Sequence, residues 1–154
     1  MAKSNEGIKV LSVNKKARFN YSIEDTYECG ISLVGTEVKS IKDGRFSYVD
    51  SYASVENNEL WLLGLHVTPY IYGNRVNHDP LRRRKLLVHR KEIRELSRVT
   101  MEKGLTLVPL KFYLKRGIVK CEIGVARGKK LFDKRDDIRK KDQTRELQRD
   151  YRVK

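Results

Sequence analysis

Tyr21-Ser-Ile-Glu-Asp-Thr-Tyr-Glu-Cys-Gly-Ile-Ser-Leu33 is the stretch in which the pattern of a β-strand is clearest. Apolar residues occupy every second position, as they do in a strand with one buried face, and only Asp25 interrupts them. The alternate positions are polar and include Glu28, so we expect the second face to be accessible. Gly30 lies where a long strand would bend to help close a barrel. The stretch therefore predicts a long strand with one buried and one accessible face.

Similar patterns on both sides of this stretch predict five more strands and two helices. One helix is expected over residues 37–42, with Thr36 as its N-cap and Gly44 as its stop, and the other over residues 89–103. The strands are expected at residues 8–13, 46–56, 60–68, 105–114 and 118–126, with turns at Asn57-Asn58 and Lys115-Arg116-Gly117.

The strand over residues 105–114 carries Val108, Leu110, Phe112 and Leu114 at alternate positions, so we expect all four to face the core. Six short strands with antiparallel connections predict an all-β fold with inserted helices. We expect a closed antiparallel β-barrel of the oligonucleotide-binding (OB) type, with about six strands, two short helices and an extended basic C-terminal tail. A β-sandwich is the alternative, because strand order is not visible in a sequence.

The net charge of +14 is concentrated in two parts of the chain. Residues 75–103 hold 10 Lys/Arg against 4 Asp/Glu, and residues 127–154 hold 12 against 6. Clustered positive charge is typical of proteins that bind a polyanion, because phosphates that are neutralised release their counterions. A basic protein with solvated charged faces is the simpler alternative.

The chain changes character after Gly128, where the alternation of the last strand ends. Residues 129–154 contain no Gly or Pro, and their few apolar residues form no continuous stripe. A chain of 154 residues is expected to build one core. We therefore predict an RNA-binding β-barrel domain over residues 1–128 and a basic tail over residues 129–154. Without packing, the tail should be disordered or only partly helical alone.

The side chains that catalysis or metal binding would require do not cluster in the sequence. The three histidines have no Cys or carboxylate at the spacing of metal ligands, and Cys29 and Cys121 are isolated. Asp136 and Asp137 form a carboxylate pair by adjacency alone. We expect no enzyme activity, no metal and no cofactor. No apolar run approaches the roughly 18 residues that span a bilayer, so we expect a cytoplasmic protein without a membrane partner.

The segment from Asn74 to Lys85 interleaves hydrogen-bonding side chains with a basic cluster. Asn77, His78 and Asp79 are suited to bond bases or ribose hydroxyls. The cluster Arg82, Arg83, Arg84 and Lys85 is suited to bind phosphates or to stack. The segment predicts an RNA-binding loop.

Seven short motifs follow one another along the chain: Asn14-Lys-Lys-Ala-Arg18, Glu28-Cys-Gly30, Gly35-Thr-Glu-Val-Lys-Ser40, Asp50-Ser-Tyr52, Asn77-His-Asp-Pro-Leu-Arg82, Arg84-Lys-Leu-Leu87 and Gly124-Val-Ala-Arg-Gly-Lys-Lys130. Their residues, order and spacing resemble those of the small protein B (SmpB) family, the bacterial partners of transfer-messenger RNA (SsrA RNA). The resemblance covers the chain from about Ile8 onward.

The resemblance implies an OB-type barrel that grips the tRNA-like domain of transfer-messenger RNA. It implies an adaptor that enters stalled ribosomes for trans-translation, which rescues the ribosome and tags the nascent chain. The tail is then expected to become helical in the decoding region and the empty messenger channel. The protein is expected to be monomeric and to perform no covalent chemistry itself.

The resemblance also assigns site residues. Glu28 is expected to accept a hydrogen bond from a base, with a strand-face salt bridge as the alternative. Leu87 is expected to pack on a base or ribose, although a core position is equally natural. Further RNA contacts are expected at Lys15, Lys16, Arg18, Arg127, Lys129 and Lys130, and decoding-region contacts at Phe132, Asp133, Lys134 and Arg135.

A generic single-stranded nucleic-acid-binding protein is the rival hypothesis. It requires several aromatic residues on one exposed strand face, and a tail that can be removed without loss of function.

Overall fold

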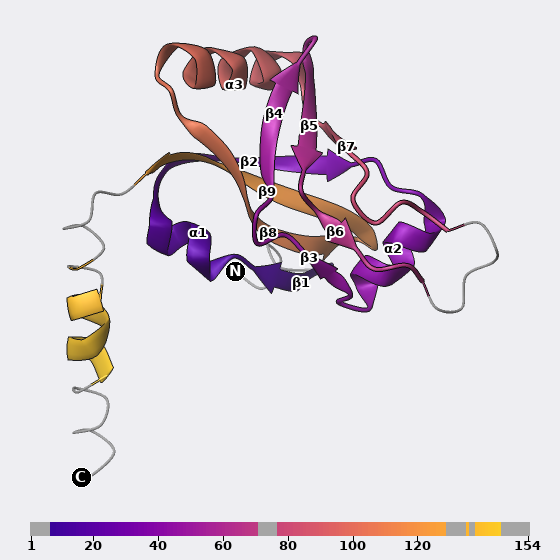
Figure 1. Cartoon of the computed structure of the whole chain (residues 1–154), viewed down its shortest axis with the longest axis horizontal. Coiled ribbons are helices and arrows are strands. Elements are labelled where there is room, and N and C mark those ends of the chain that lie inside the picture. Colours follow the sequence, from indigo (N-terminus) through magenta and orange to yellow (C-terminus); the bar gives the residue numbers. More distant parts are fainter. Residues whose placement is uncertain (1–6, 71–76, 129–134, 136–137, 146–154) are drawn as a thin grey trace.

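The structure is a computed structural model that describes residues 7–70, 77–128, 135 and 138–145. These residues build a mostly β fold with a few helices (Figure 1), as the sequence predicts in coarse outline. The elements follow one another as β1 (Ile8–Val13), α1 (Lys15–Asn20), β2 (Tyr21–Ile31), α2 (Gly35–Lys42), β3 (Phe46–Ser47), β4 (Tyr52–Glu56), β5 (Glu59–Leu63), β6 (His66–Val67), β7 (Arg84–Leu87), α3 (Arg90–Glu102), β8 (Thr106–Lys115) and β9 (Ile118–Gly128).

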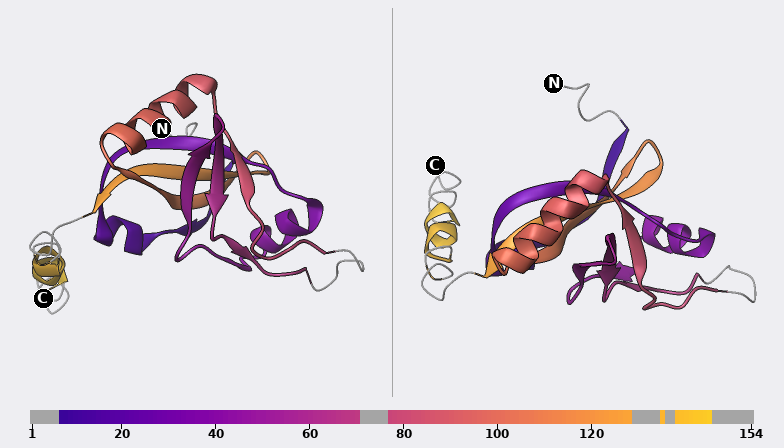
Figure 2. Two further views of the ribbon diagram at one scale, coloured as in Figure 1. Left: turned by 45° about the horizontal axis from the view of Figure 1, so that its top comes forward. Right: turned by 90° about the horizontal axis from the view of Figure 1, so that it is seen from above.

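Seven strands form one sheet in the order β1-β8-β4-β5-β7-β2-β9, and β9 pairs in turn with β8. All of these pairings are antiparallel. The short strands β3 and β6 form a separate pair. Helix α3 lies across the end of the molecule to which β4 and β5 rise, while α1 and α2 lie on opposite flanks (Figure 1). The short helix of residues 138–145 stands outside the strands, on the side of α1 (Figure 2).

The strand β2 contains a register shift that divides its apolar residues between two clusters. The shift lies between Ile23 and Asp25, where one extra residue interrupts the pairing with β9. Beyond the shift, Tyr27 and Cys29 pack in the main core. Before it, Tyr21 and Ile23 pack on a smaller cluster around Ala17 of α1. The prediction of one continuous apolar face was therefore wrong, because a bulge moves every later side chain to the other face.

The strand β8 behaves in the same way. Its register shifts between Pro109 and Lys111. Val108 and Leu110 belong to the smaller cluster, whereas Phe112 and Leu114 lie in or against the main core. The prediction that all four face one core is corrected accordingly.

Two elements were not predicted. No helix was predicted between residues 13 and 21, but Lys15–Asn20 form α1, because the Asn14 side chain accepts a hydrogen bond from the Ala17 N–H (3.1 Å) and caps the helix. The strand β7 lies in the basic segment that we expected to be a loop. Its Leu86 is 1% exposed and pairs with β5 and β2.

Other boundaries differ in detail. The helix α2 begins at Gly35, and the Val34 N–H donates to Glu37 Oε1 (2.9 Å) in place of a cap by Thr36. The segments predicted as strands over 46–56 and 60–68 are each divided into two shorter strands.

The turns are confirmed, since Asn57 and Asn58 have φ of 51° and 61° in the turn between β4 and β5. Arg116 and Gly117, with φ of 53° and 79°, form the turn between β8 and β9. Among the described residues, no helix is long and apolar enough to cross a membrane.

Candidate RNA interface

The helix α1 presents a basic surface. Its Ala17 packs against the protein and is buried, whereas Lys15, Lys16 and Arg18 are exposed. Asn14 fixes the helix to β8: its N–H donates to the Leu110 carbonyl (2.7 Å) and its side-chain amide donates to the Pro109 carbonyl (2.9 Å). The three predicted cations are therefore held on a short, anchored helix and are accessible to phosphates.

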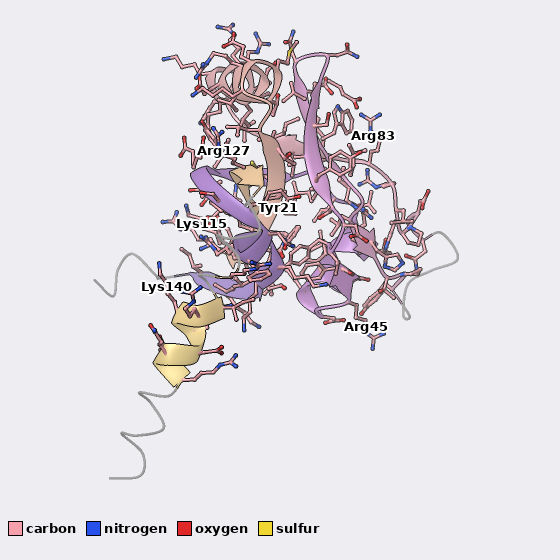
Figure 3. All side chains as sticks on the ribbon, turned by 60° about the vertical axis from the view of Figure 1, so that its left-hand side comes forward. Tyr21, Arg45, Arg83, Lys115, Arg127 and Lys140 are labelled. Carbon is pink, nitrogen blue, oxygen red and sulfur yellow. The ribbon has the colours of Figure 1, made fainter. Side chains whose placement is uncertain are left out.

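Arg127 lies near this helix, at the end of the sheet where β2 meets β9. Figure 3 labels Arg127 and Tyr21, and Tyr21 pairs with Gly128, the last residue of β9. Arg127 is exposed and its Nε lies 3.0 Å from Glu24 Oε1. The cations of α1 and Arg127 thus gather where the chain leaves the sheet toward the tail.

Glu28 lies on the accessible face of β2, as predicted. Its carboxylate accepts a hydrogen bond from the Tyr113 hydroxyl (2.5 Å) and pairs with Lys115 (3.3 Å). The hydrogen bond from Tyr113 outweighs partial burial and, together with Lys115, holds the pKa of Glu28 below its usual value. The strand-face salt bridge therefore exists, and the side chain still remains 43% exposed. Glu28 is an ionised, oriented acceptor that a partner can reach.

A row of paired residues crosses the sheet beside Glu28. Leu87 of β7 pairs with Gly30 of β2, Gly30 with Lys120 of β9, Lys120 with Tyr113 of β8, and Tyr113 with Val10 of β1. Directly paired residues of antiparallel strands project to the same face. We call the surface formed by Val10, Glu28, Leu87, Tyr113, Lys115 and Lys120 the outer face.

Four members of the outer face were not among the predicted site residues: Val10, Tyr113, Lys115 and Lys120. Their proximity to Glu28 depends on strand order and register, which the sequence does not reveal. Lys115 and Lys120 supply positive charge beside Glu28, while Glu122, which is paired with Glu28 between β2 and β9, is engaged by Lys111 (3.3 Å). Tyr113 is 5% exposed, and its burial and its bond to Glu28 raise its pKa well above the ordinary value of 10.

Leu87 is 52% exposed, which removes the core alternative for this residue. It lies against Gly30, where an added Cβ would be 3.2 Å from the Leu87 Cβ. Because Gly30 has no side chain, Leu87 can pack directly over the backbone of β2. Leu87 thereby forms an apolar patch at the edge of a charged face.

The predicted loop residues are used mainly by the fold. Arg84 is fully buried and cannot bind phosphate as predicted, because its Nε bonds to Glu37 and its Nη1 donates to the Leu65 carbonyl (2.7 Å). His78 is 9% exposed, and its ring bonds to the Val67 carbonyl (2.8 Å) and to Thr36 (2.9 Å). These two predictions of direct RNA contact are corrected.

Three neighbours of these residues also bond within the protein. The Asn77 side chain donates to the Tyr70 carbonyl (3.0 Å), and Asp79 Oδ1 accepts from the Leu81 N–H (3.0 Å). The Arg82 guanidinium is directed at Glu37 (2.6 Å). These bonds give the segment a defined shape. RNA contacts by Asp79, which is exposed, and by the partly exposed Asn77 and Arg82 remain predictions.

Glu37 is the centre of a buried ionic cluster with Arg82 and Arg84. Glu37 and Arg84 are both 0% exposed, and Arg84 Nε lies 2.5 Å from Glu37 Oε2. Burial by itself would raise the pKa of Glu37. Hydrogen bonds from Arg82, the Val34 N–H and Arg84 outweigh this effect and lower the pKa below its usual value. The cluster joins the start of α2 to β7.

Arg83 and Lys85 alternate with these buried groups and point outward. The Arg83 guanidinium lies 4.7 Å from the centre of the Trp61 ring and pairs with Glu56 (2.5 Å). Lys85 pairs with Glu59 (3.6 Å). Both remain accessible, so their predicted RNA contacts stand as predictions.

A cavity of about 430 Å³ separates α1 from the segment that leads into β4. Asp50, Ser51 and Tyr52, one of the seven motifs, line it together with Asn14 and Lys16. Thr106 and Val108 of β8 also line the cavity, so residues from three parts of the sequence meet beside the basic helix.

Five predicted residues lie outside the described part of the chain: Lys129, Lys130, Phe132, Asp133 and Lys134. Arg135 is described and exposed. Within the helix of residues 138–145, Lys141 Nζ lies 5.9 Å from the centre of the Phe19 ring of α1. Among the described residues, no group of three or more His, Cys, Asp or Glu side chains is arranged to hold a metal.

A curved sheet with a cation-rich outer face and a basic helix at its end defines a nucleic-acid-binding protein. Comparison with known proteins shows to which family within this class the chain belongs. The family model described as "SmpB protein" matches residues 11–153, and the chain belongs to this family.

Individual relatives are similar in sequence to this protein along almost the whole chain. The SsrA-binding protein of Caldanaerobacter subterraneus subsp. tengcongensis is 55% identical over 154 residues, which cover 100% of this chain and 98% of the relative. The SsrA-binding protein of Bacillus subtilis is 57% identical over 144 residues, which cover 94% and 92%.

A solved structure described as "tmRNA-SmpB: a journey to the center of the bacterial ribosome" contains a similar chain. It matches with a TM-score of 0.65 and 49% identity, over 78% of this chain and 85% of that one. The resemblance found in the sequence is thereby confirmed.

The ionic cluster yields a prediction about stability. Glu37→Gln should lower the free energy of unfolding by about 3–5 kcal/mol, because two arginines would lose their buried partner. Urea unfolding followed by circular dichroism measures this loss. The control Glu56→Gln, which removes a partner of the exposed Arg83, should cost less than about 1 kcal/mol. Equal losses in the two variants would contradict the structural role of Glu37.

The same variant should change the pH dependence of stability. The pKa of Glu37 is lower in the folded than in the unfolded protein. The contribution of Glu37 to the free energy of unfolding is therefore complete above its unfolded pKa of about 4.3, and it is lost as the pH falls through its folded pKa. Glu37→Gln should therefore flatten the acid limb of the stability curve, whereas Glu56→Gln should leave the limb unchanged.

Proposed function

We propose that the protein is an adaptor that binds the tRNA-like domain of transfer-messenger RNA (SsrA RNA) and delivers it to stalled ribosomes for trans-translation. Membership of the SmpB family is the observation that carries this conclusion, because relatives named SsrA-binding protein match nearly the full chain. The family also confirms the prediction that the chain is not an enzyme. The partners are transfer-messenger RNA and the ribosome, and the protein acts as a monomer in the cytoplasm, where ribosomes work.

The fold proposed for this role is a closed OB-type barrel. The succession β8-β4-β5-β7-β2-β9, with β9 paired to β8, supports closure. Most of the buried residues of these strands belong to one main core, as a barrel interior requires, while Val108, Leu110 and Ala126 belong to the smaller cluster.

The outer face is the proposed surface for the tRNA-like domain. Lys115 and Lys120 bind phosphates, and Leu87 packs on a base or ribose. Glu28 accepts a hydrogen bond from a base while Tyr113 holds its carboxylate in place (2.5 Å). The cations of α1 and Arg127 bind the RNA backbone at the adjoining end of the sheet.

A second role is proposed for the tail. Residues 1–128 form the RNA-binding domain, and residues 129–154 enter the decoding region and the empty messenger channel, where Phe132, Asp133, Lys134 and Arg135 contact ribosomal RNA. Residues 138–145 are helical in the structure, which supports a helical tail on the ribosome.

The rival function, generic binding of single strands, is poorly supported by the outer face. Tyr113 is the one aromatic residue among the six that define this face, and it is 5% exposed. It cannot act as a stacking platform for successive bases.

Two substitutions can distinguish a hydrogen bond between Glu28 and a base from the effect of the charge of Glu28 alone. Glu28→Gln should weaken binding of the tRNA-like domain by roughly ten-fold or more, because a hydrogen bond to a charged acceptor contributes about 1.5–3 kcal/mol. Fluorescence anisotropy with labelled RNA measures the affinity. Glu24→Gln removes the same charge from the same strand and frees Arg127, so it should bind equally or more tightly. If both variants bind more tightly than the unaltered protein, Glu28 does not recognise a base.

The division between domain and tail can be tested by truncation after Lys130. The shortened protein should bind the tRNA-like domain nearly as tightly as the full chain, because the outer face is intact. It should fail to support tagging of nascent chains on stalled ribosomes in a reconstituted translation system. Tagging by the truncated protein, or a loss of RNA affinity that parallels the loss of tagging, would refute the division.

A further inference from the structure

A second basic site lies apart from the outer face, where the turn between β4 and β5 meets the first half of α3. A cavity of about 410 Å³ is present there, lined by Asn57, Asn58, Glu59, Arg90, Ile93 and Arg94. Figure 1 shows the β4–β5 turn beside one end of α3. None of the residues predicted to bind RNA lines this cavity.

The two arginines of this cavity have no ionic or hydrogen-bonding partner within the described part of the chain. Both are exposed. Glu59, the one acidic residue in the lining, is engaged by Lys85 (3.6 Å). On the same helix, Arg98 is paired with Glu95 (2.5 Å) and Glu102 (3.5 Å). The cavity therefore holds two uncompensated positive charges, whereas Arg98, further along the helix, is compensated.

The placement of these charges is unfavourable for the helix itself. Arg90 and Arg94 are one turn apart, a spacing at which like charges repel. Arg90 and Lys91 begin the helix, where the positive end of the helix dipole disfavours cations and Glu92 is the one acidic residue of the first turn, while the last turn contains no basic residue. Local interactions therefore do not explain why arginines occupy these positions. A bound anion would relieve both the repulsion and the conflict with the dipole.

The strand β7 connects the outer face with the helix that lines the cavity. In the sheet β7 lies between β2 and β5, so Leu87 has Gly30 on one side and the strand that starts at Glu59 on the other. Arg90 follows Leu87 by three residues. An RNA backbone that passes Leu87 on the outer face would reach Arg90 and Arg94 next.

We propose that this cavity binds the phosphodiester backbone of the RNA that lies on the outer face. Arg90 and Arg94 contact phosphates, and the side-chain amides of Asn57 and Asn58 bond to phosphate or ribose oxygens. The inference rests on the proposed function for the identity of the RNA. It adds a contact region that the sequence motifs do not indicate.

The test uses the full-length protein with Arg90→Gln and Arg94→Gln combined. Binding of the tRNA-like domain is measured by anisotropy over a range of KCl concentrations. The double variant should bind roughly ten-fold or more weakly at low salt. Its plot of log affinity against log salt should be less steep by about 1.4–1.8, since each phosphate contact contributes about 0.7–0.9. The melting temperature should be unchanged or higher, because a repulsion has been removed.

The control combines Arg98→Gln with Lys103→Gln, which removes one charge from the same helix and one from its C-cap, both outside the cavity. Its salt slope should equal that of the unaltered protein. The proposal is overturned if Arg90→Gln/Arg94→Gln keeps the original slope, if the control loses as much slope, or if the affinity falls together with the melting temperature. Each of these results leaves the proposed function in place, since that function is tested separately at Glu28.

Discussion

The buried cluster of Glu37, Arg82 and Arg84 is the constraint on which the rest of the structure depends. A carboxylate and a guanidinium that are both 0% exposed lose their hydration, and only close pairing and further hydrogen bonds offset that cost. Arg84 therefore also donates to the Leu65 carbonyl (2.7 Å) and the Arg82 carbonyl (3.0 Å). These bonds fix β7 against the start of α2. Because β7 is fixed, Leu87 reaches the outer face and α3 begins where the β4–β5 turn can meet it.

The cluster also changes the meaning of the basic run in this segment. Arg82 and Arg84 turn toward Glu37, whereas Arg83 and Lys85 turn outward, as the alternation of a strand requires. One half of the run thus stabilises the fold and the other half adds to the surface. A count of positive charges overstates the surface available to RNA. Accessible cations lie on α1, at Arg127, on the outer face, at Arg83 and Lys85 and at the start of α3.

Much of the fold could be predicted because its signals are local. The alternation from Tyr21 onward, the Asn57-Asn58 turn and the helix α3 depend on neighbouring residues, and each is present. The bulges in β2 and β8 could not be predicted, because one extra residue alters which face is buried without altering the composition. The short helix α1 depends on a cap by Asn14 and on its contacts with β8.

The residues around Glu28 were missed for a related reason, since strand pairing brings Tyr113 and Lys120 close to it. The motifs shared with the SmpB family indicated Glu28 and Leu87 but neither the partners of Glu28 nor the interior role of Arg84.

The central claim is that RNA binds the outer face while the Glu37 cluster remains buried and unchanged. Nuclear magnetic resonance of the isotope-labelled full-length protein tests it directly, because the backbone amides and the Arg Nε–H groups can be followed in one titration with the tRNA-like domain. We expect the amides of Glu28, Leu87 and Lys120 to shift on binding. The Nε–H signal of Arg84 should stay at its free-protein position and remain protected from exchange with water. A shift of the Arg84 signal with no change at Glu28, Leu87 and Lys120 would contradict this arrangement.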